Sequence, residues 1–455
     1  MPSIKPNQLE GWWRSRGYGW MLRVTPGAFE LYDTVGLVSL LRESGPIDDL
    51  FECCDRFAFS GPDELSLFHR GDLTRHQFDR SGGPVTIFPS GQHKDPVSNF
   101  NFLCQLFDEH HAFLRERGVD WKEVSRAYRS RVTASASDEK LLDVFSEMLA
   151  PLRDNHVYVA SPTRVVSSDK LAPLRPDFQR AFRLPTTRVS SRSTVDAIAP
   201  QILCTLLADF PSAKSTFRSG CNDVLSWCEL EPGIGYINIL RLFGFADTVA
   251  ARTADDLPHS RIEAARFLED DMAALERELD SVMIDLASMR AIIVDIRING
   301  GGFDHAGLAI AGRFAGSERL AYTKQTKWGS TRTAAQQICV HPVQRPSYHG
   351  PIVLLTSALT LSAGEVFALC MRALPNVTTV GEATLGILSD NLLKCLPNGW
   401  EVSLSNEIYT AADGNVYEVV GVPPDFSEPV FGGGSILESF RTWLAAAVRL
   451  AKSRL

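Results

Sequence analysis

One serine in this sequence stands where a buried strand would pass into a helix. An apolar run ends at Thr356, a short loop follows, and a helical pattern begins near Ser362. A hydroxyl at the first turn of a helix lies among unpaired backbone N–H groups, at the end of the helix dipole that favours negative charge. Ser362 could therefore act as a nucleophile, with the N–H of Ala363 beside it. The alternative is that Ser362 is an ordinary helix cap. This segment alone favours the cap, because Glu365 follows three residues later, which is the spacing of a capping box.

Three consecutive glycines, Gly300 to Gly302, form a second candidate element. They come directly after the apolar run that begins at Ala291 and ends in Asp295-Ile-Arg-Ile-Asn. Glycine permits positive φ and lets a backbone approach a ligand closely, and successive N–H groups can form a nest for an oxyanion. The Gly-Lys-Ser/Thr ending of a phosphate-binding loop is missing. A tight turn is the alternative.

A histidine and a glutamate complete the candidate chemistry. His156 stands at the turn between a helical pattern that ends near Leu152 and the strand-like Val157-Tyr-Val. Glu418 comes shortly before the Gly/Pro-rich turn that ends at Asp425. An imidazole can take a hydroxyl proton, and a carboxylate can orient the ring. Taken alone, each residue is more simply explained as structural or exposed.

These residues need a rigid frame, and the apolar pattern supplies one. From Gly233 onward, strand-length apolar runs at 234–240, 291–296 and 351–356 alternate with helical patterns. Strands of that kind are buried on both faces, as in an α/β layer. Before them, residues 100–152 have helical periodicity. The first 80 residues contain short aromatic strands, in which Trp12, Trp13, Tyr18 and Trp20 are expected to be core more readily than a ligand pocket.

Composition excludes several classes of protein. The chain has 455 residues and a formal net charge of −8 with scattered Lys and Arg, so neither a nucleic-acid footprint nor a polybasic membrane surface is present. Nine irregularly spaced cysteines are typical of a reduced compartment, and Cys204, Cys339 and Cys370 lie in apolar runs that predict burial. No window is apolar enough to span a bilayer. We therefore expect a cytoplasmic protein, unless a signal peptide has been removed.

In this order, the four segments resemble the family of C-terminal processing (tail-specific) proteases. They are most similar to the branch that contains the tricorn protease core and the interphotoreceptor retinoid-binding protein modules. The resemblance extends over residues 99–425 and is most specific from Gly235 onward. The matching residues are Asp295, Arg297, Asn299, Gly301 and Gly302; Ser362, Ala363 and Glu365; Gly381, Glu382, Thr384 and Gly386; and Gly421, Val422, Pro424 and Asp425.

The resemblance implies an α/β catalytic core of the ClpP/crotonase-like type and a serine peptidase that works through an acyl-enzyme. Ser362 would be the nucleophile, His156 the base and Glu418 the carboxylate that orients it. Leu152 and Asp154 complete the histidine motif. Gly301 or Gly302, together with Ala363, would form the oxyanion hole. No metal or cofactor is implied.

The same family has a branch that uses a Ser–Lys dyad. That branch is disfavoured here, because the segment 381–389 contains no lysine and Lys394 falls in a later strand-like segment. The chain also departs from tricorn itself, because Asn155 and Ala363 stand where tricorn has a serine and an aspartate.

We expect four parts: a small β-rich domain (1–85), a linker (86–100), a helical cap segment that carries His156 (101–190), and an α/β serine hydrolase core (191–455). The partner would be a peptide substrate, and a homo-oligomer is left open. Two other functions also remain open, a non-catalytic ligand-binding protein on the same scaffold and a hydrolase of a non-peptide ester or amide.

Overall fold

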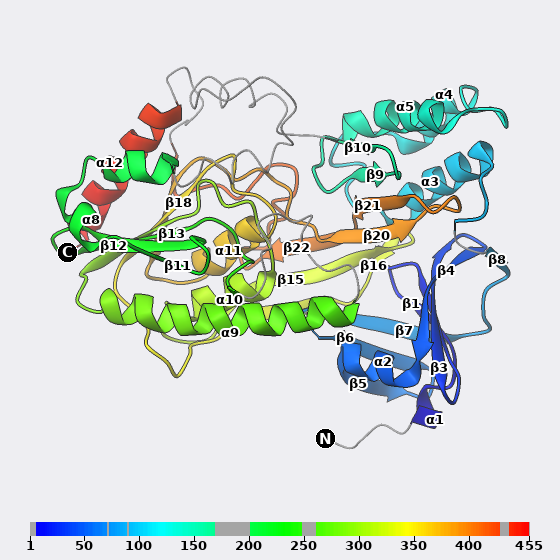
Figure 1. Ribbon diagram of the computed structural model, residues 1–455, viewed down its shortest axis with the longest axis horizontal. Helices are drawn as coiled ribbons and strands as arrows, with labels where there is room; N and C mark the ends of the chain where they lie inside the picture. The colour runs from blue at the N-terminus through cyan, green and yellow to red at the C-terminus, as the bar shows by residue number, and fades with distance from the viewer. Residues whose placement is uncertain are drawn as a thin grey trace. The chain divides into compact units, whose positions relative to one another are not determined.

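The computed structural model describes residues 6–70, 72–88, 91–168, 201–247, 261–427 and 436–454. The chain divides into two compact units, each built from separated stretches of sequence (Figure 1). Unit 1 contains Met1–Lys170, Lys324–Gln336 and Ser389–Ile408, and unit 2 contains the remaining residues.

Unit 1 begins with an eight-stranded sheet in the order β5-β6-β7-β1-β2-β3-β4-β8. Neighbouring strands that are consecutive in the sequence pair antiparallel, whereas β4 and β8 pair parallel. The strands are β1 (Gly11–Ser15), β2 (Trp20–Val24), β3 (Ala28–Val35), β4 (Val38–Pro46), β5 (Cys54–Gly61), β6 (Glu64–His69), β7 (Arg75–Ser81) and β8 (Thr86–Phe88), and the helices are α1 (Pro6–Leu9) and α2 (Ile47–Cys53).

The aromatic residues of this sheet are mainly core, as the sequence predicted. Trp13 is fully buried, and Tyr18 and Trp20 stack on each other with ring centroids 4.8 Å apart. Stacked rings remove a large apolar area from water, which stabilises this sheet. The β-rich N-terminal domain is thus confirmed.

Three capped helices follow the sheet. They are α3 (Pro96–His110), α4 (Trp121–Arg129) and α5 (Asp138–Leu149), and the 3-10 turn η1 (Ala150–Leu152) ends the last of them. The side chains of Asp95, Asp120 and Ser137 accept hydrogen bonds from the first turns of these helices. Such caps satisfy N–H groups that a helix leaves unpaired, which fixes where each helix begins.

Distant parts of the sequence complete unit 1. A four-stranded sheet has the order β10-β9-β21-β20, with β9 (Tyr158–Ala160), β10 (Val165–Ser167), β20 (Asn391–Cys395) and β21 (Glu401–Ser405). The late hairpin β20–β21 thereby pairs with the strand that directly follows His156.

Unit 2 is built on a seven-stranded sheet in the order β11-β12-β13-β14-β18-β19-β23. From β13 to β23 all neighbours are parallel, while β11, β12 and β13 pair antiparallel. The strands are β11 (Arg218–Gly220), β12 (Leu225–Glu231), β13 (Ile234–Ile239), β14 (Ala291–Asp295), β18 (Ile352–Thr356), β19 (Val377–Gly381) and β23 (Phe426–Ser427). The apolar runs of the sequence are the central strands β13, β14 and β18, as predicted.

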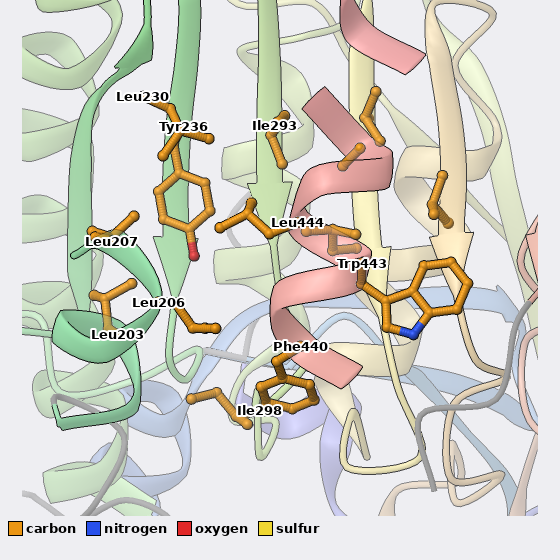
Figure 2. Packing of buried hydrophobic residues seen from close by; sticks show 14 of the residues in the cluster. Leu203, Leu206, Leu207, Leu230, Tyr236, Ile293, Ile298, Phe440, Trp443 and Leu444 are labelled. Carbon is orange, nitrogen blue, oxygen red and sulfur yellow. The ribbon is translucent and has the colours of Figure 1, made fainter. Parts of the chain in front are cut away.

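Helices cover both faces of this sheet, as parallel strands require. Figure 1 shows α9 (Arg261–Asp285) along one side and α12 (Ile436–Ser453) on the other. In Figure 2, Phe440, Trp443 and Leu444 of α12 lie over the strands, close to Ile293 and Ile298. Other helices with described bounds are α8 (Pro211–Thr216), α10 (Asp304–Gly312) and α11 (Ala363–Arg372).

A further sheet has the order β16-β15-β17, with β22 paired to β15. These strands are β15 (Arg319–Trp328), β16 (Thr331–Arg332), β17 (Gln336–Val340) and β22 (Glu407–Ala411). The chain passes from unit 2 to unit 1 within β15 and returns at the start of β17. It enters unit 1 again at Ser389 and returns to unit 2 within β22.

The compact units do not follow the four expected parts. Strand β8 and the start of α3 fall inside residues 86–100, the expected linker, because β8 pairs with β4 and Asp95 caps α3. The expected boundary at 190/191 lies outside the described residues. Sequence patterns report local structure, so they cannot show that residues 389–408 join the N-terminal unit.

The cysteines are free thiols, and their burial differs from expectation. Cys370 is buried, but Cys339 is only partly buried and Cys204 is exposed. Ile202, Leu203, Leu206 and Leu207 turn inward from the helical segment 201–207, which leaves Cys204 on its outer face. Along the described residues, no helix combines the length and the apolar character needed to cross a bilayer.

Candidate active site

Ser362 occupies a sharp turn between β18 and α11. Its backbone has φ 56° and ψ −133°, a combination that lies outside the allowed regions for residues with a β-carbon. Such strain persists only where the surroundings enforce it. The Ser362 N–H donates to the carbonyl of Ile387 at 3.1 Å, and the N–H of Leu361 donates to the carbonyl of Asn299 at 3.1 Å. A serine on a strained strand-to-helix turn is the arrangement of a nucleophile elbow.

The buried side chain of Glu365 stabilises this turn through hydrogen bonds. Its buried carboxylate accepts hydrogen bonds from the Thr384 hydroxyl at 2.5 Å, the Gly386 N–H at 2.6 Å and the Ile387 N–H at 2.8 Å. It also accepts from the Ser362 N–H at 3.2 Å, which is the carboxylate arm of a capping box. The glutamate of the Ser-Ala-x-Glu motif therefore joins the serine turn to the segment 384–387.

The glycine loop lies directly against Ser362. Gly301 has φ 87°, and a β-carbon on it would lie 2.7 Å from the β-carbon of Ser362 and 3.0 Å from the nitrogen of Ala363. The N–H of Gly301 donates to the side-chain oxygen of Asn299 at 2.8 Å. Within the described part of the chain, the N–H groups of Gly302 and Ala363 have no hydrogen-bond acceptor. These two donors can therefore receive a developing oxyanion.

The Asp and Arg of the preceding motif are structural. Asp295 and Arg297 form a buried ion pair at 2.6 Å, and the Tyr236 hydroxyl donates to Asp295 at 2.7 Å. Burial would lower the pKa of Arg297, but the carboxylate of Asp295 raises it. Arg297 also donates to the carbonyl of Phe440 on α12 at 2.7 Å. This network fixes the end of β14, from which the glycine loop emerges.

Glu418 lies beside the segment that supports Ser362. The N–H of Leu388 donates to its carboxylate at 2.7 Å, and the N–H of Val419 donates to the carbonyl of Gly386 at 2.8 Å. Val419 has φ 76°, a rare conformation for a β-branched residue. Unit 2 thus brings Ser362, the glycine loop and Glu418 to one set of adjoining loops.

His156 belongs to unit 1, where Asp154 orients its backbone. The N–H of His156 donates to one Asp154 oxygen at 3.0 Å. The other oxygen is 3.0 Å from Arg117 and 2.9 Å from the Ser405 hydroxyl, which donates to it. Burial by itself raises the pKa of Asp154, but His111 and Arg117 more than offset this, so the pKa is lowered and the group is ionised.

Two buried lysines of unit 1 are held by carboxylates. Lys394 lies 2.8 Å from Asp33 and donates to the carbonyl of Gly19 at 2.9 Å. Burial lowers the pKa of Lys394 to about 8. Lys324 lies 2.7 Å from Glu407 and 3.0 Å from Asp390. Both amines therefore have structural partners, which argues against a Ser–Lys dyad. Among the described residues, no His, Cys, Asp or Glu cluster is arranged to hold a metal ion.

Two family models match the chain. Residues 261–427 match peptidase family S41, and residues 92–150 match the tricorn protease C1 domain. The first range contains Ser362, Glu418 and the glycine loop, whereas His156 lies outside both ranges.

Solved structures are similar as well. A candidate peptidase from Parabacteroides merdae is 22% identical with a TM-score of 0.58, over 79% of this chain and 97% of that chain. Mature CPAF is 11% identical with a TM-score of 0.51, over 79% of this chain and 96% of that chain. These two likenesses show a shared fold. The tricorn protease is 13% identical with a TM-score of 0.41, over 97% of this chain and 46% of that chain, too distant to support an argument.

The protein is a serine-type peptidase, a class of hydrolase. More particularly, it carries an S41 peptidase domain together with a tricorn C1 domain, so the predicted resemblance to tail-specific and tricorn proteases is confirmed. The architecture is mixed α/β, with a β-rich N-terminal domain and an S41 core.

Sequence reasoning missed two features of the site. The strained backbone of Ser362 cannot be recognised from the sequence, because serine is also common at ordinary, unstrained helix caps. The environment of Asp154 joins residues from three distant segments, so only its place in the histidine motif could have pointed to it.

Proposed function

We propose that the peptidase acts through a Ser-His-Glu triad formed by Ser362, His156 and Glu418. The observation that carries this proposal is the strained turn of Ser362, with Gly301 packed against it and the N–H of Ala363 at the start of α11. A strained, non-glycine residue at this position is hard to explain by helix capping, because a cap needs only an extended backbone.

Each residue has one role in the reaction. Neutral His156 takes the hydroxyl proton of Ser362 as its oxygen attacks the substrate carbonyl, and Glu418 stabilises the imidazolium that forms. The imidazolium then protonates the leaving amine, which leaves an acyl-enzyme. Water, activated by the same imidazole, releases the acyl group and restores the serine.

The oxyanion site consists of backbone N–H groups. Gly302 and Ala363 supply the donors, while the N–H of Gly301 stays with Asn299 and the missing side chain of Gly301 leaves room beside the serine. Each such donor typically lowers the barrier by about 3 kcal/mol.

The proposal requires the His156 loop of unit 1 to reach Ser362 of unit 2. Reaction with a fluorophosphonate probe, mapped by mass spectrometry, tests this requirement. We expect an adduct on Ser362 that is abolished in Ser362→Ala and slowed at least about 100-fold in His156→Ala. Exposed Ser330→Ala serves as the matched control.

Two other outcomes would contradict the proposed triad. Labelling of Ser362 that is unchanged in His156→Ala would exclude this base. Absent labelling, together with tight binding of an apolar ligand, would favour a non-catalytic binding protein. A library of peptides and simple esters would then separate peptide cleavage from hydrolysis of another acyl group.

The core would be of the ClpP/crotonase-like type. The chain would divide into the β-rich domain (1–85), the linker (86–100), the helical cap segment (101–190) and the α/β hydrolase core (191–455). The S41 match supports a peptide partner, and the acidic net charge argues against a nucleic acid. The nine free thiols support a cytoplasmic location. A homo-oligomer is compatible with these proposals.

A further inference from the structure

A buried, irregular segment of unit 2, residues 240–246, lies against the glycine loop. It follows β13, and each of its residues is buried. The segment meets the loop in an isolated parallel bridge between Leu242 and Gly302. A β-carbon on Gly302 would lie 2.5 Å from the carbonyl carbon of Leu242, so this approach requires glycine. The two backbones are therefore in direct contact beside a proposed oxyanion donor.

Two hydrogen bonds fix the orientation of the peptide groups around Gly302. The N–H of Leu242 donates to the carbonyl of Gly301 at 2.8 Å, and the N–H of Phe303 donates to the carbonyl of Leu242 at 2.9 Å. The C=O of Gly301 and the N–H of Gly302 belong to one planar trans peptide group, in which they point in opposite directions. Because the Gly301 carbonyl is held toward Leu242, the Gly302 N–H is directed away from Leu242, where it can receive an oxyanion.

One buried carboxylate binds the far end of the segment. The three successive N–H groups of residues 244–246 donate to Asp271 of α9 at 2.5 to 2.9 Å. Asp271 is 1% exposed. Burial raises its pKa, and the three N–H groups oppose that rise because they favour the ionised form. Successive N–H groups that converge on one anion form a nest of charge-assisted hydrogen bonds, so α9 fixes where this turn lies.

Asn222 binds the carbonyl groups of the same turn. Its side-chain amide donates to the carbonyls of Gly244 and Ala246 at 3.1 and 3.0 Å. Gly244 has φ 77°, the left-handed conformation in which the turn reverses. Buried backbone groups need hydrogen-bond partners, which a neighbouring strand usually supplies. In this turn, Asp271 and Asn222 supply them from side chains.

We propose that Asp271 and Asn222 are positioning residues of the peptidase, which fix the turn 244–246 and, through Leu242, set the direction of the Gly302 N–H. The inference rests on the oxyanion role of Gly302 in the proposed function. An oxyanion exists only in the transition state and the tetrahedral intermediate. Loss of this alignment should therefore lower kcat and leave KM nearly unchanged.

Asp271→Asn weakens this support with little change in shape. The amide offers one acceptor oxygen, and its NH₂ group would face an N–H donor. With a fluorogenic peptide, we expect kcat per active site to fall at least about tenfold and KM to stay within about twofold. Active sites are counted by the fluorophosphonate bound at completion, so that unfolded protein does not enter kcat.

Asn222→Gly tests the same turn from a residue near the surface. Asn222 is exposed and has φ 55°, a conformation that glycine adopts without strain, so the variant loses the two hydrogen bonds and keeps the backbone. We expect kcat per active site to fall about threefold or more, with KM unchanged. This variant tests the turn even where Asp271→Asn folds poorly.

Two controls lie on α9 as well. Asp270→Asn changes the exposed neighbour of Asp271 and should keep the normal kcat. Asp280→Asn weakens ion pairs with Arg313 and Arg345, so it should lower stability in urea and leave kcat per active site unchanged. The second control separates a loss of stability from a loss of alignment.

A peptide boronic acid gives an independent readout, because it forms a tetrahedral adduct with a serine hydroxyl. We expect it to bind Asp271→Asn about tenfold more weakly than the wild type. The matching peptide carboxylic acid forms no such adduct and should bind both proteins equally. Equal boronate affinity in the two proteins would contradict the proposal.

The kinetic outcomes distinguish this inference from the catalytic proposal. Unchanged kcat per active site in both Asp271→Asn and Asn222→Gly would overturn it, even with reduced stability, because the turn would then be only structural. A higher KM with unchanged kcat would also overturn it, since the segment would then bind substrate. Failure of the catalytic proposal looks different: the wild type neither cleaves peptide nor labels at Ser362, and this inference then falls with it.

Discussion

A β-carbon on Gly301 would lie 2.7 Å from the β-carbon of Ser362. This close approach ties the glycine loop after β14 to the turn after β18, two parallel neighbours in one sheet. Parallel strands present their carboxyl ends at the same edge, so the loops that follow them meet there.

Gly301→Ala should reduce kcat/KM at least about 100-fold, because the new methyl group collides with the serine turn and displaces the oxyanion donors. The positive φ of Gly301 adds strain for any residue with a β-carbon. Gly316→Ala is the control, since a β-carbon there meets nothing within 4 Å. Unchanged peptidase activity in Gly301→Ala would show that the glycine loop does not serve the reaction.

Glu365→Gln should lower the free energy of unfolding by about 2–3 kcal/mol, because a neutral amide replaces a carboxylate that accepts four hydrogen bonds. Urea denaturation measures the effect. Glu318→Gln, which breaks only an exposed pair with His341, should cost less than about 1 kcal/mol. Equal losses in the two variants would contradict a supporting role for Glu365.

Asp154→Asn should slow fluorophosphonate labelling of Ser362 about tenfold or more, because the amide cannot accept hydrogen bonds from His156, Arg117 and Ser405 together. Asp143→Asn disrupts only an exposed ion pair with Arg164 and should label at the normal rate. Normal labelling of Asp154→Asn would remove this residue from the positioning of the base.

Lys394→Met should destabilise the protein by about 3–5 kcal/mol, because it leaves the buried carboxylate of Asp33 without its main partner. The folded fraction should still label at Ser362, and the double variant Asp33→Asn/Lys394→Met should regain part of the stability. Lys140→Met, at an exposed position of α5, controls for loss of charge. Folded but unreactive protein would instead revive a Ser–Lys mechanism.

The buried carboxylate of Glu407 should give the stability a measurable pH dependence. Burial raises its pKa to about 7, with Asp390 and Asp72 adding to the rise and Lys324 opposing it. Tyr18 and Thr74 also face this carboxylate. The folded chain therefore holds a proton that the unfolded chain has released between pH 4.5 and 7, so this group's stabilisation is lost as pH rises through that window.

Glu407→Gln isolates that contribution. Urea unfolding from pH 5 to 7 should show the wild type losing stability relative to the variant, by on the order of 1 kcal/mol per pH unit. His110, whose pKa is lowered to about 3, acts in the opposite direction in both proteins, so it cancels from the comparison. Parallel pH profiles would show that Glu407 titrates normally.

The sequence predicted the local structure around the site well. The strands β13, β14 and β18 are continuous apolar runs. A strand that is buried on both faces has no alternating polar residues, so it is easy to recognise in the sequence. The start of α11 was predicted because a serine and a glutamate three residues apart mark a helix start. The choice of Ser362, His156 and Glu418 rested on four motifs in order and on the family that they resemble, and it stays a prediction.

Only the tertiary structure decided how these pieces are used. Residues 389–408 join the N-terminal unit because β21 pairs with β9 through the backbone and Lys394 pairs with Asp33 through side chains. Both contacts join residues that are hundreds of positions apart in the sequence. Likewise, the choice of Gly302 over Gly301 as a free donor depends on a single hydrogen bond to Asn299. Residue types and spacing determine strands, helices and candidate groups, because these follow from local preference. Strain, burial and the pairing of charges arise from packing, and packing exists only once the chain has folded.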